Sequence, residues 1–234
     1  MKISFVIGLR DREDKRVLNC VLSLLQQNYK DVEIIVLSYG GRRYDFLETI
    51  SKKLKYVYFK TNKVWSRSRA LNLGIKEATG DIIITTDIDL VFSPNVAQEV
   101  FKLMNHKHDR NRYLYANFVM MEEEMWDEQV IFGNHLDEFK TDRNLFTIIG
   151  TGGFQCMNRD MWYECGGFKE LYKGWGVEDI DLYQRIQKLA SDVRLLKDVT
   201  IVHQWHSPEH SKEIKKAIEQ NNNYIVGRGK GDLK

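Results

Sequence analysis

The sequence predicts an α/β fold in which helices flank a mostly parallel, Rossmann-like sheet. In the first hundred residues, short apolar segments rich in β-branched residues alternate with longer segments whose apolar residues recur at helical spacing. Such alternation is typical of βαβ units, whose strands are parallel. Continuous apolar runs such as Ile82-Ile83-Ile84 suit strands that are covered on both faces. With 234 residues and 43% hydrophobic content, one compact domain is expected.

The elements of the first half, about residues 1–105, follow one another in regular order. A helix is expected up to about Met104, with Ser93 as its N-cap and Pro94 in its first turn. The other predicted elements are strands at Ile3–Ile7, Val32–Leu37, Tyr56–Phe59 and Ile82–Thr86, with helices at Lys15–Gln27, Tyr44–Leu54 and Ser66–Lys76 between them.

The second half, about residues 106–220, becomes rich in glycine from Thr147 onward, which indicates tight turns and close approach of backbone to a ligand. The structure of Glu122–Phe132 is ambiguous, and residues 221–234 are expected to form a tail, with Gly227–Gly231 solvated. The predicted elements are a strand at Tyr113–Met121, a helix from near Val177 to about Ala190, and short strands at Val193–Leu196 and Thr200–Val202.

Composition excludes several classes of protein. The 35 Lys and Arg against 33 Asp and Glu leave a formal charge of +2, which does not suggest nucleic-acid binding. Three irregularly spaced cysteines argue against a disulfide framework and for a reducing, cytoplasmic location. No stretch approaches about 20 uncharged apolar residues, so no transmembrane segment is expected, while peripheral membrane association stays open. Neither a P-loop nor a Gly-x-Gly-x-x-Gly dinucleotide motif is present.

Asp87 and Asp89 follow the apolar strand Ile82–Thr86. Open parallel sheets bind ligands outside the carboxyl ends of their strands, which places these residues at the expected crevice. Because they are two residues apart, both carboxylates point to one side of an extended backbone, where a divalent cation could bridge protein and diphosphate. The alternative is a chance Asp-x-Asp triplet in a chain rich in acids.

His203 and His206 stand three residues apart near a predicted strand end. This spacing allows both imidazoles, or one ligand and one supporting group, to converge on a cation. The alternative is a pair of surface histidines. Carboxylate and imidazole ligands together with diphosphate oxygens suit Mn²⁺ or Mg²⁺ better than a closed structural zinc site, which normally recruits cysteines.

Glu178 and Asp179 fall in the first turn of a predicted helix, where the helix dipole and free amides keep an acid ionised. Such an acid could serve as a general base, although acids are also common at helix starts for stability alone. Gly174 and Gly176 flank Trp175 and would let its indole swing or lie against a ligand such as the apolar face of a sugar.

Arg67 and Arg69 open the predicted helix that precedes the Asp87 strand. A phosphate there could meet both guanidinium groups and the free amides of the helix N-terminus. The alternative is a solvated basic face.

With these residues the chain resembles GT-A glycosyltransferases of family 2. The N-terminal half is similar to that family at Ser23–Val36, Arg69–Ile75 and Thr86–Asp89. The C-terminal half resembles β-1,4-galactosyltransferases and chondroitin-polymerase type enzymes at Gly152–Phe154, Gly166–Phe168, Gly174–Asp179 and His206–Ser207. The resemblance implies a single GT-A domain whose first half binds a nucleotide sugar and whose second half binds the acceptor.

The resemblance also implies roles for individual residues. Asp89 and His206 would be metal ligands for Mn²⁺ or Mg²⁺, and His203 stands where related enzymes place a methionine or histidine ligand. Asp179 would be the catalytic base. The implied acceptor contacts are Glu178 and Trp175, and the implied donor contacts are Asp87 and, less closely matched, Arg69.

One departure from the family pattern concerns the nucleotide. Family 2 enzymes usually have an acidic pair after the second strand that contacts uracil, whereas this chain has Leu37-Ser38-Tyr39-Gly40. Tyr39 could stack on the base instead, and uridine is inferred from the rest of the pattern.

The expected function is metal-dependent, inverting transfer from a UDP-sugar to a glycan hydroxyl, with galactose or N-acetylgalactosamine as the first candidates for the sugar. Two alternatives stay open: a non-catalytic module that binds nucleotide sugars or glycans, and a metal-dependent nucleotide-sugar hydrolase that uses the same ligands to activate water.

Overall fold

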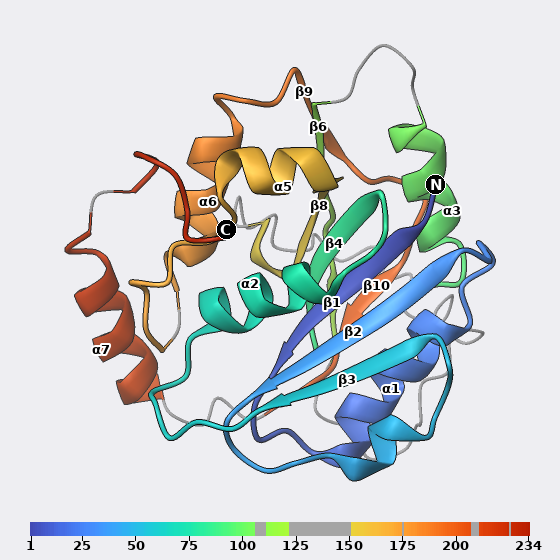
Figure 1. Cartoon of the computed structure of the whole chain (residues 1–234), viewed down its shortest axis with the longest axis horizontal. Coiled ribbons are helices and arrows are strands. Elements are labelled where there is room, and N and C mark those ends of the chain that lie inside the picture. Colours follow the sequence, from blue (N-terminus) through green and yellow to red (C-terminus); the bar gives the residue numbers. More distant parts are fainter. Residues whose placement is uncertain (106–110, 122–150, 175, 207–210, 225) are drawn as a thin grey trace.

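The computed structural model describes residues 1–105, 111–121, 151–174, 176–206, 211–224 and 226–234. Its main sheet has seven strands in the order β3-β2-β1-β4-β8-β6-β9 (Figure 1). Helices cover both faces of this sheet, which confirms the predicted α/β architecture. None of the described helices combines the length and apolar character that a bilayer-spanning segment requires.

Six of the seven strands run in one direction. β1 (Ile3–Leu9) lies between β2 (Val32–Tyr39) and β4 (Ile82–Asp87) and is parallel to both. Only β8 is reversed, because it pairs antiparallel with β4 on one side and with β6 on the other. The remaining strands are β3 (Leu54–Phe59), β6 (Arg112–Tyr115), β8 (Phe154–Asn158) and β9 (Asp192–Leu195).

The alternation of side chains along the strands builds two apolar cores. Phe5 and Ile7 of β1 pack toward α1 (Asp14–Leu25) and α3 (Val96–Met104), whereas Val6 belongs to the core on the opposite face. That second core is covered by α2 (Arg67–Glu77), α5 (Arg159–Cys165) and α6 (Glu178–Ile186).

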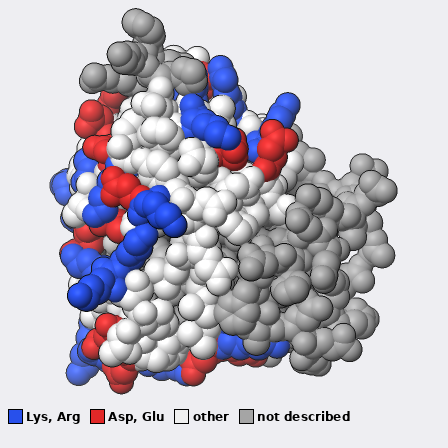
Figure 2. Space-filling view, turned by 90° about the vertical axis from the view of Figure 1, so that its right-hand side faces the viewer, with Lys and Arg blue, Asp and Glu red and all other residues white. Residues whose placement is uncertain are grey.

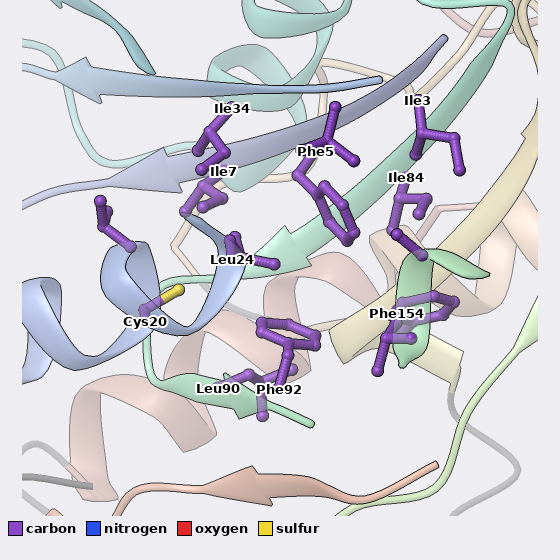
Figure 3. Packing of buried hydrophobic residues seen from close by; sticks show 14 of the residues in the cluster. Ile3, Phe5, Ile7, Cys20, Leu24, Ile34, Ile84, Leu90, Phe92 and Phe154 are labelled. Atoms are coloured by element: carbon purple, nitrogen blue, oxygen red, sulfur yellow. The ribbon is translucent and has the colours of Figure 1, made fainter. Parts of the chain in front are cut away.

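Aromatic rings from three strands fill the core beneath the crevice. Phe5 of β1, Phe92 of β5 (Leu90–Phe92) and Phe154 of β8 gather around one another in Figure 3, with ring centroids 6.1 Å apart for Phe5 and Phe92 and 6.5 Å apart for Phe92 and Phe154. Leu90 packs in the same cluster. This packing anchors the short strand that follows Asp89.

A second, three-stranded sheet was not expected from the sequence. It has the order β5-β10-β7, where β10 is Ile201–His203 and β7 is Val119–Met120. β10 pairs antiparallel with β5, and this register places His203 opposite Leu90. The small sheet therefore brings the histidine segment beside the end of β4.

Several predicted elements differ from the structure. The helix expected at Tyr44–Leu54 is wrong: the segment contains only a short 3₁₀ turn, Asp45–Glu48, because Leu54 already pairs with Ile34 as the start of β3. Ser93 does not cap α3, which begins at Val96 after Asn95. The Ser93 hydroxyl instead donates to Asn95 Oδ1 and accepts from the Thr200 amide.

The strand expected at Tyr113–Met121 is two strands, β6 and β7, which belong to different sheets. The helix expected near Val177 is confirmed as α6, although it ends at Ile186. Glu122–Phe132 lies outside the described residues.

The C-terminal segment is not the solvated tail that its composition predicts. Leu233 is only 5% exposed and packs in the core beneath α2 and α5. The Gly231 amide donates to Cys165 O, and the Leu233 amide donates to Gly166 O. A Cβ on Gly231 would lie 2.2 Å from Gly166 O, so only glycine allows this backbone approach.

Charge is mixed on the molecular face shown in Figure 2, where Lys and Arg side chains lie among Asp and Glu. No continuous basic surface is visible among the described residues of that face. This distribution agrees with the balanced composition.

Glu33 on β2 is the polar residue that ties the sheet to the loop after α2. Its carboxylate accepts hydrogen bonds from Ser4 Oγ, Thr79 N and Thr79 Oγ1 and forms an ion pair with Lys2. Partial burial raises the pKa of Glu33, but the bonds from Lys2, Ser4 and Thr79 outweigh it and lower the pKa to about 2.

We predict that Glu33→Gln lowers the free energy of unfolding by about 1–2 kcal/mol at pH 7. Because the folded-state pKa lies below the unfolded value, this stabilisation is present above about pH 4.5 and is lost as the pH falls toward 2. Urea unfolding at several pH values between 2 and 7 measures the free energy of unfolding, and Glu48→Gln, at an exposed position, is the control. An equal loss at pH 3 and pH 7 would contradict the assignment.

Candidate active site

The candidate site lies at the carboxyl ends of the parallel strands. β4 ends at Asp87, and the chain turns through Ile88 and Asp89 before β5 begins at Leu90. Ile88 is buried in the core and pins this turn. The turn separates the two carboxylates: Asp87 contacts Arg67, whereas Asp89 faces the histidines.

Asp89, His203 and His206 form a cluster that could hold a metal ion. Asp89 Oδ1 lies 3.8 Å from His203 Nε2, and Asp89 Oδ2 lies 3.8 Å from His206 Nε2. Their potential ligand atoms all lie within 4.8 Å of one another. A cation holds nitrogen and oxygen ligands at about 2.1 Å, so two ligands of one ion are at most about 4.2 Å apart. Both aspartate–histidine distances fit one ion.

The donor set of this cluster is one carboxylate and two imidazoles. His203 Nδ1 is buried without a hydrogen-bond partner among the described residues, so its polar contact is made through Nε2 toward Asp89. The three cysteines are buried free thiols and are not part of the cluster. Mixed oxygen and nitrogen ligands suit Mn²⁺ or Mg²⁺ when diphosphate oxygens complete the coordination shell of the ion.

A buried glutamine supports the cluster, and sequence reasoning missed it. Gln204 lies between the two histidines and is fully buried. Its backbone N–H donates to Asp89 O at 2.8 Å. In its side chain, Oε1 accepts from Asn19 Nδ2 at 3.0 Å and Nε2 donates to Arg16 O. These bonds hold the histidine segment against α1 and the Asp89 turn. The available signal was a polar residue, Asn19, among the apolar residues of α1.

Arg67 is the cation at the centre of the site. It is 8% exposed, its Nε donates to Asp87 Oδ1 at 2.7 Å, and its Nη2 donates to Gly152 O. Its Nη1 lies 3.9 Å from Glu178 Oε1. Arg67 therefore links the end of β4 to the start of α6 through its interactions with Asp87 and Glu178. These interactions are separate from any contact of Arg67 with a phosphate.

Burial shifts the ionisation of the two acids beside Arg67. Burial raises the pKa of Asp87, and the Asp89 charge adds to this rise, while Arg67 opposes it. Burial likewise raises the pKa of Glu178 to about 7, with Arg67 opposing the shift and Asp179 adding to it. Acids at functional sites often have pKa values raised in this way.

Asp179 has a more open environment than Glu178. α6 begins after Val177, whose φ of 76° turns the chain into the helix, and Asp179 is half-buried whereas Glu178 is buried. A Cβ on Gly152 would lie 2.4 Å from Asp179 Oδ2, so glycine at that position leaves room for this carboxylate. Asp179 is thus the acid of the pair with access to solvent.

The glycines around Trp175 have a packing role that was not expected. Gly174 and Gly176 have φ values of 68° and 91°, which favour glycine. A Cβ on Gly174 would lie 2.9 Å from Ala217, and one on Gly176 would lie 3.0 Å from Ile218. Both glycines are therefore explained by backbone conformation and close helix packing. Trp175 lies outside the described residues.

The structure shows the surroundings of two further predicted donor contacts, Tyr39 and Arg69. Tyr39 is 1% exposed and stacks on Phe59 with ring centroids 5.4 Å apart, so it is a core residue and the expected stacking on a base is wrong. Arg69 forms an ion pair with Glu170 at 3.4 Å, and its contact with the donor stays a prediction. Ser66 caps α2, because its hydroxyl accepts from the Arg69 amide.

Two family models match the chain. The model described as glycosyl transferase family 2 matches residues 4–165, and the model described as the N-terminal domain of galactosyltransferase matches residues 131–210. The matched regions overlap and together reach from β1 to beyond His206.

Known proteins of similar sequence and structure carry related names. Human chondroitin sulfate N-acetylgalactosaminyltransferase 2 is 21% identical over 91% of this chain and 41% of its own length. TarS 1–349 of S. aureus, crystallised with UDP-GlcNAc, is similar in structure with a TM-score of 0.67, 16% identity, and coverage of 90% of this chain and 60% of that chain. The mannosyltransferase PcManGT of Pyrobaculum calidifontis, with GDP-Man and Mn²⁺, has a TM-score of 0.62, 14% identity, and coverage of 89% and 58%.

The chain spans only about a third of the length of several curated relatives, with coverage of 33%, 29% and 34% of their lengths. The structural similarities establish the GT-A fold. Because the family 2 model covers residues 4–165, well over half of the sequence, the chain belongs to glycosyl transferase family 2.

Proposed function

We propose that the chain transfers a sugar from a UDP-sugar to a hydroxyl of a glycan acceptor, with inversion at the anomeric carbon and with a divalent cation. The observation that carries this proposal is the convergence of Asp89, His203 and His206, which come from distant parts of the sequence, at the carboxyl edge of the sheet. In open α/β sheets this edge is the usual place for ligands.

Asp89, His203 and His206 would hold Mn²⁺ or Mg²⁺, and the Mn²⁺ named with the similar mannosyltransferase supports this choice. When bound, the cation supplies Lewis acidity toward diphosphate oxygens. Asp87 stands beside the cluster and is proposed to contact the donor. Arg67 balances the Asp87 charge and is also proposed to contact a phosphate of the donor.

Asp179 is proposed as the base that accepts the proton of the acceptor hydroxyl. Its carboxylate is partly open to solvent and sits at the start of α6, whereas Glu178 is buried against Arg67. A base must come within hydrogen-bond reach of the hydroxyl, which favours the accessible acid. Glu178 and Trp175 are proposed to contact the acceptor, so that residues 106–220 serve the acceptor and residues 1–105 the donor.

The donor is proposed to be a uridine diphosphate sugar. UDP-GlcNAc in the similar TarS structure and the N-acetylgalactosaminyltransferase name of the human relative support uridine and an N-acetylated or galactose-type sugar. Tyr39 contributes nothing to this choice because it is buried. The three buried free thiols are compatible with the proposed reducing, cytoplasmic location.

We predict that Asp89→Asn weakens Mn²⁺ binding by at least the 10–100-fold that is typical when a residue supporting a metal ligand is removed. Calorimetric titration of Mn²⁺ into the folded variant measures this change. Asp31→Asn is the matched control, because Asp31 is an exposed carboxylate at the opposite end of β2. Unchanged Mn²⁺ affinity in Asp89→Asn would remove the cluster as the metal site.

We predict that Asp179→Asn lowers kcat for transfer by about 10²–10⁴-fold while donor affinity stays unchanged, since base catalysis typically contributes that much. Asp160→Asn, an exposed acid in the first turn of α5, is the matched control.

The assay monitors a panel of UDP-sugars with Mn²⁺, with and without glycan acceptors. Undiminished transfer by Asp179→Asn would reject Asp179 as the base. Release of free sugar at equal rates with and without acceptor would identify a hydrolase, and binding of donor without any turnover would identify a non-catalytic module.

A further inference from the structure

Helix α7 (Ser211–Asn221) holds the segment Lys173–Gly176, of which Lys173, Gly174 and Gly176 are described, through one buried side chain. Asn221 is 2% exposed. Its Nδ2 donates to Lys173 O at 3.0 Å and to Gly176 O at 2.9 Å, and its Oδ1 accepts from the Lys173 amide at 3.3 Å. One amide group thus binds both ends of this four-residue segment.

The same segment is bound on its other side by the start of α2. The Gly174 amide donates to Trp65 O at 2.8 Å, and Ser66 and Gly174 form an isolated parallel bridge. Ser66 Oγ also donates to Tyr172 O at 3.1 Å. Arg67, which contacts Asp87 and Glu178, is the next residue along α2. The segment is therefore held between the Arg67 helix and α7.

Packing adds to these hydrogen bonds. A Cβ on Gly174 would lie 2.9 Å from the Ala217 side chain, and one on Gly176 would lie 3.0 Å from the Ile218 side chain, so side chains of α7 pack closely against the backbone of these two glycines. The segment leads through Val177 into α6, whose first residues are Glu178 and Asp179. A displacement of Lys173–Gly176 would consequently shift the first turn of α6, which carries Glu178 and Asp179.

We propose that Asn221 is a positioning residue, which, together with α7, fixes Lys173–Gly176 and thereby sets the reach of the α6 carboxylates toward the acceptor. This inference rests on the proposed function, because it assigns the segment to the acceptor side of that reaction. The metal cluster is independent of this contact, since its residues lie on the β4–β5 turn and in the segment that begins in β10.

Asparagine is well matched to this position because it donates two hydrogen bonds and accepts one with a single planar group. Asn221→Asp keeps the shape but turns the donor toward Lys173 O and Gly176 O into an acceptor, which repels both carbonyls. Asn221→Ala removes all three bonds. Asn222→Asp and Asn223→Asp, at exposed neighbouring positions, introduce the same charge without this contact.

The first experiment compares transfer kinetics of these variants with a UDP-sugar, Mn²⁺ and a glycan acceptor, well below the unfolding temperature. Asn221→Asp is expected to raise the acceptor KM or lower kcat by about tenfold or more, since small misplacements of reacting groups are costly. The donor KM and the Mn²⁺ affinity should stay at wild-type values, as should all constants of Asn222→Asp. A purely structural role would lower the unfolding temperature without this split, and that result would overturn the proposal.

The second experiment measures hydrogen exchange of the peptide that contains Lys173–Gly176 and needs no turnover. Asn221→Asp and Asn221→Ala should speed exchange there by about tenfold, while peptides of β1 and β4 exchange as in the wild type. Wild-type exchange in both variants would show that Asn221 does not hold the segment. If the wild type transfers no sugar while the exchange difference is present, the proposed function fails. The role of Asn221 in holding Lys173–Gly176 then still stands.

Discussion

The pairing of β5 with β10 is the contact on which the rest of the candidate site depends. It sets His203 opposite Leu90, one residue beyond Asp89, and so joins parts of the chain more than a hundred residues apart. Gln204 reinforces the pairing through the Asp89 carbonyl and through buried bonds to α1. These polar groups can be buried because each has a hydrogen-bond partner. The hydrogen bonds in turn fix the orientation of the candidate metal ligands.

The positive charge of Arg67 explains how Asp87 and Glu178 can both lie in this site. Arg67 is buried between Asp87 and Glu178, and its charge opposes the rise in pKa that burial imposes on both. A buried cation with several partners is costly to disrupt, so it also couples β4 to α6. A donor diphosphate would enter this balance of charges as a further anion. The donor and acceptor sides of the proposed reaction are thus electrostatically linked.

Local patterns were sufficient to predict the parallel strands and the start of α6, because strand ends and helical spacings are encoded by adjacent residues. The grouping of Asp89 with the histidines followed from the family resemblance, since these residues lie more than a hundred positions apart, and the structure brings them together. Features that depend on distant contacts were missed. Tyr39 was expected to stack on the nucleotide base yet stacks inside the core, and the glycines around position 175 serve the packing of α7. Asn221 likewise has no local signal, since its partners lie 45 to 48 residues away.

The most direct test of this account is a crystal structure of the chain with Mn²⁺ and UDP, with anomalous scattering recorded at the manganese edge. The account predicts one anomalous peak about 2.0–2.3 Å from Asp89, His203 and His206, with diphosphate oxygens completing its coordination. A manganese peak at other residues, or UDP bound with no manganese between it and Asp89, would contradict the central claim.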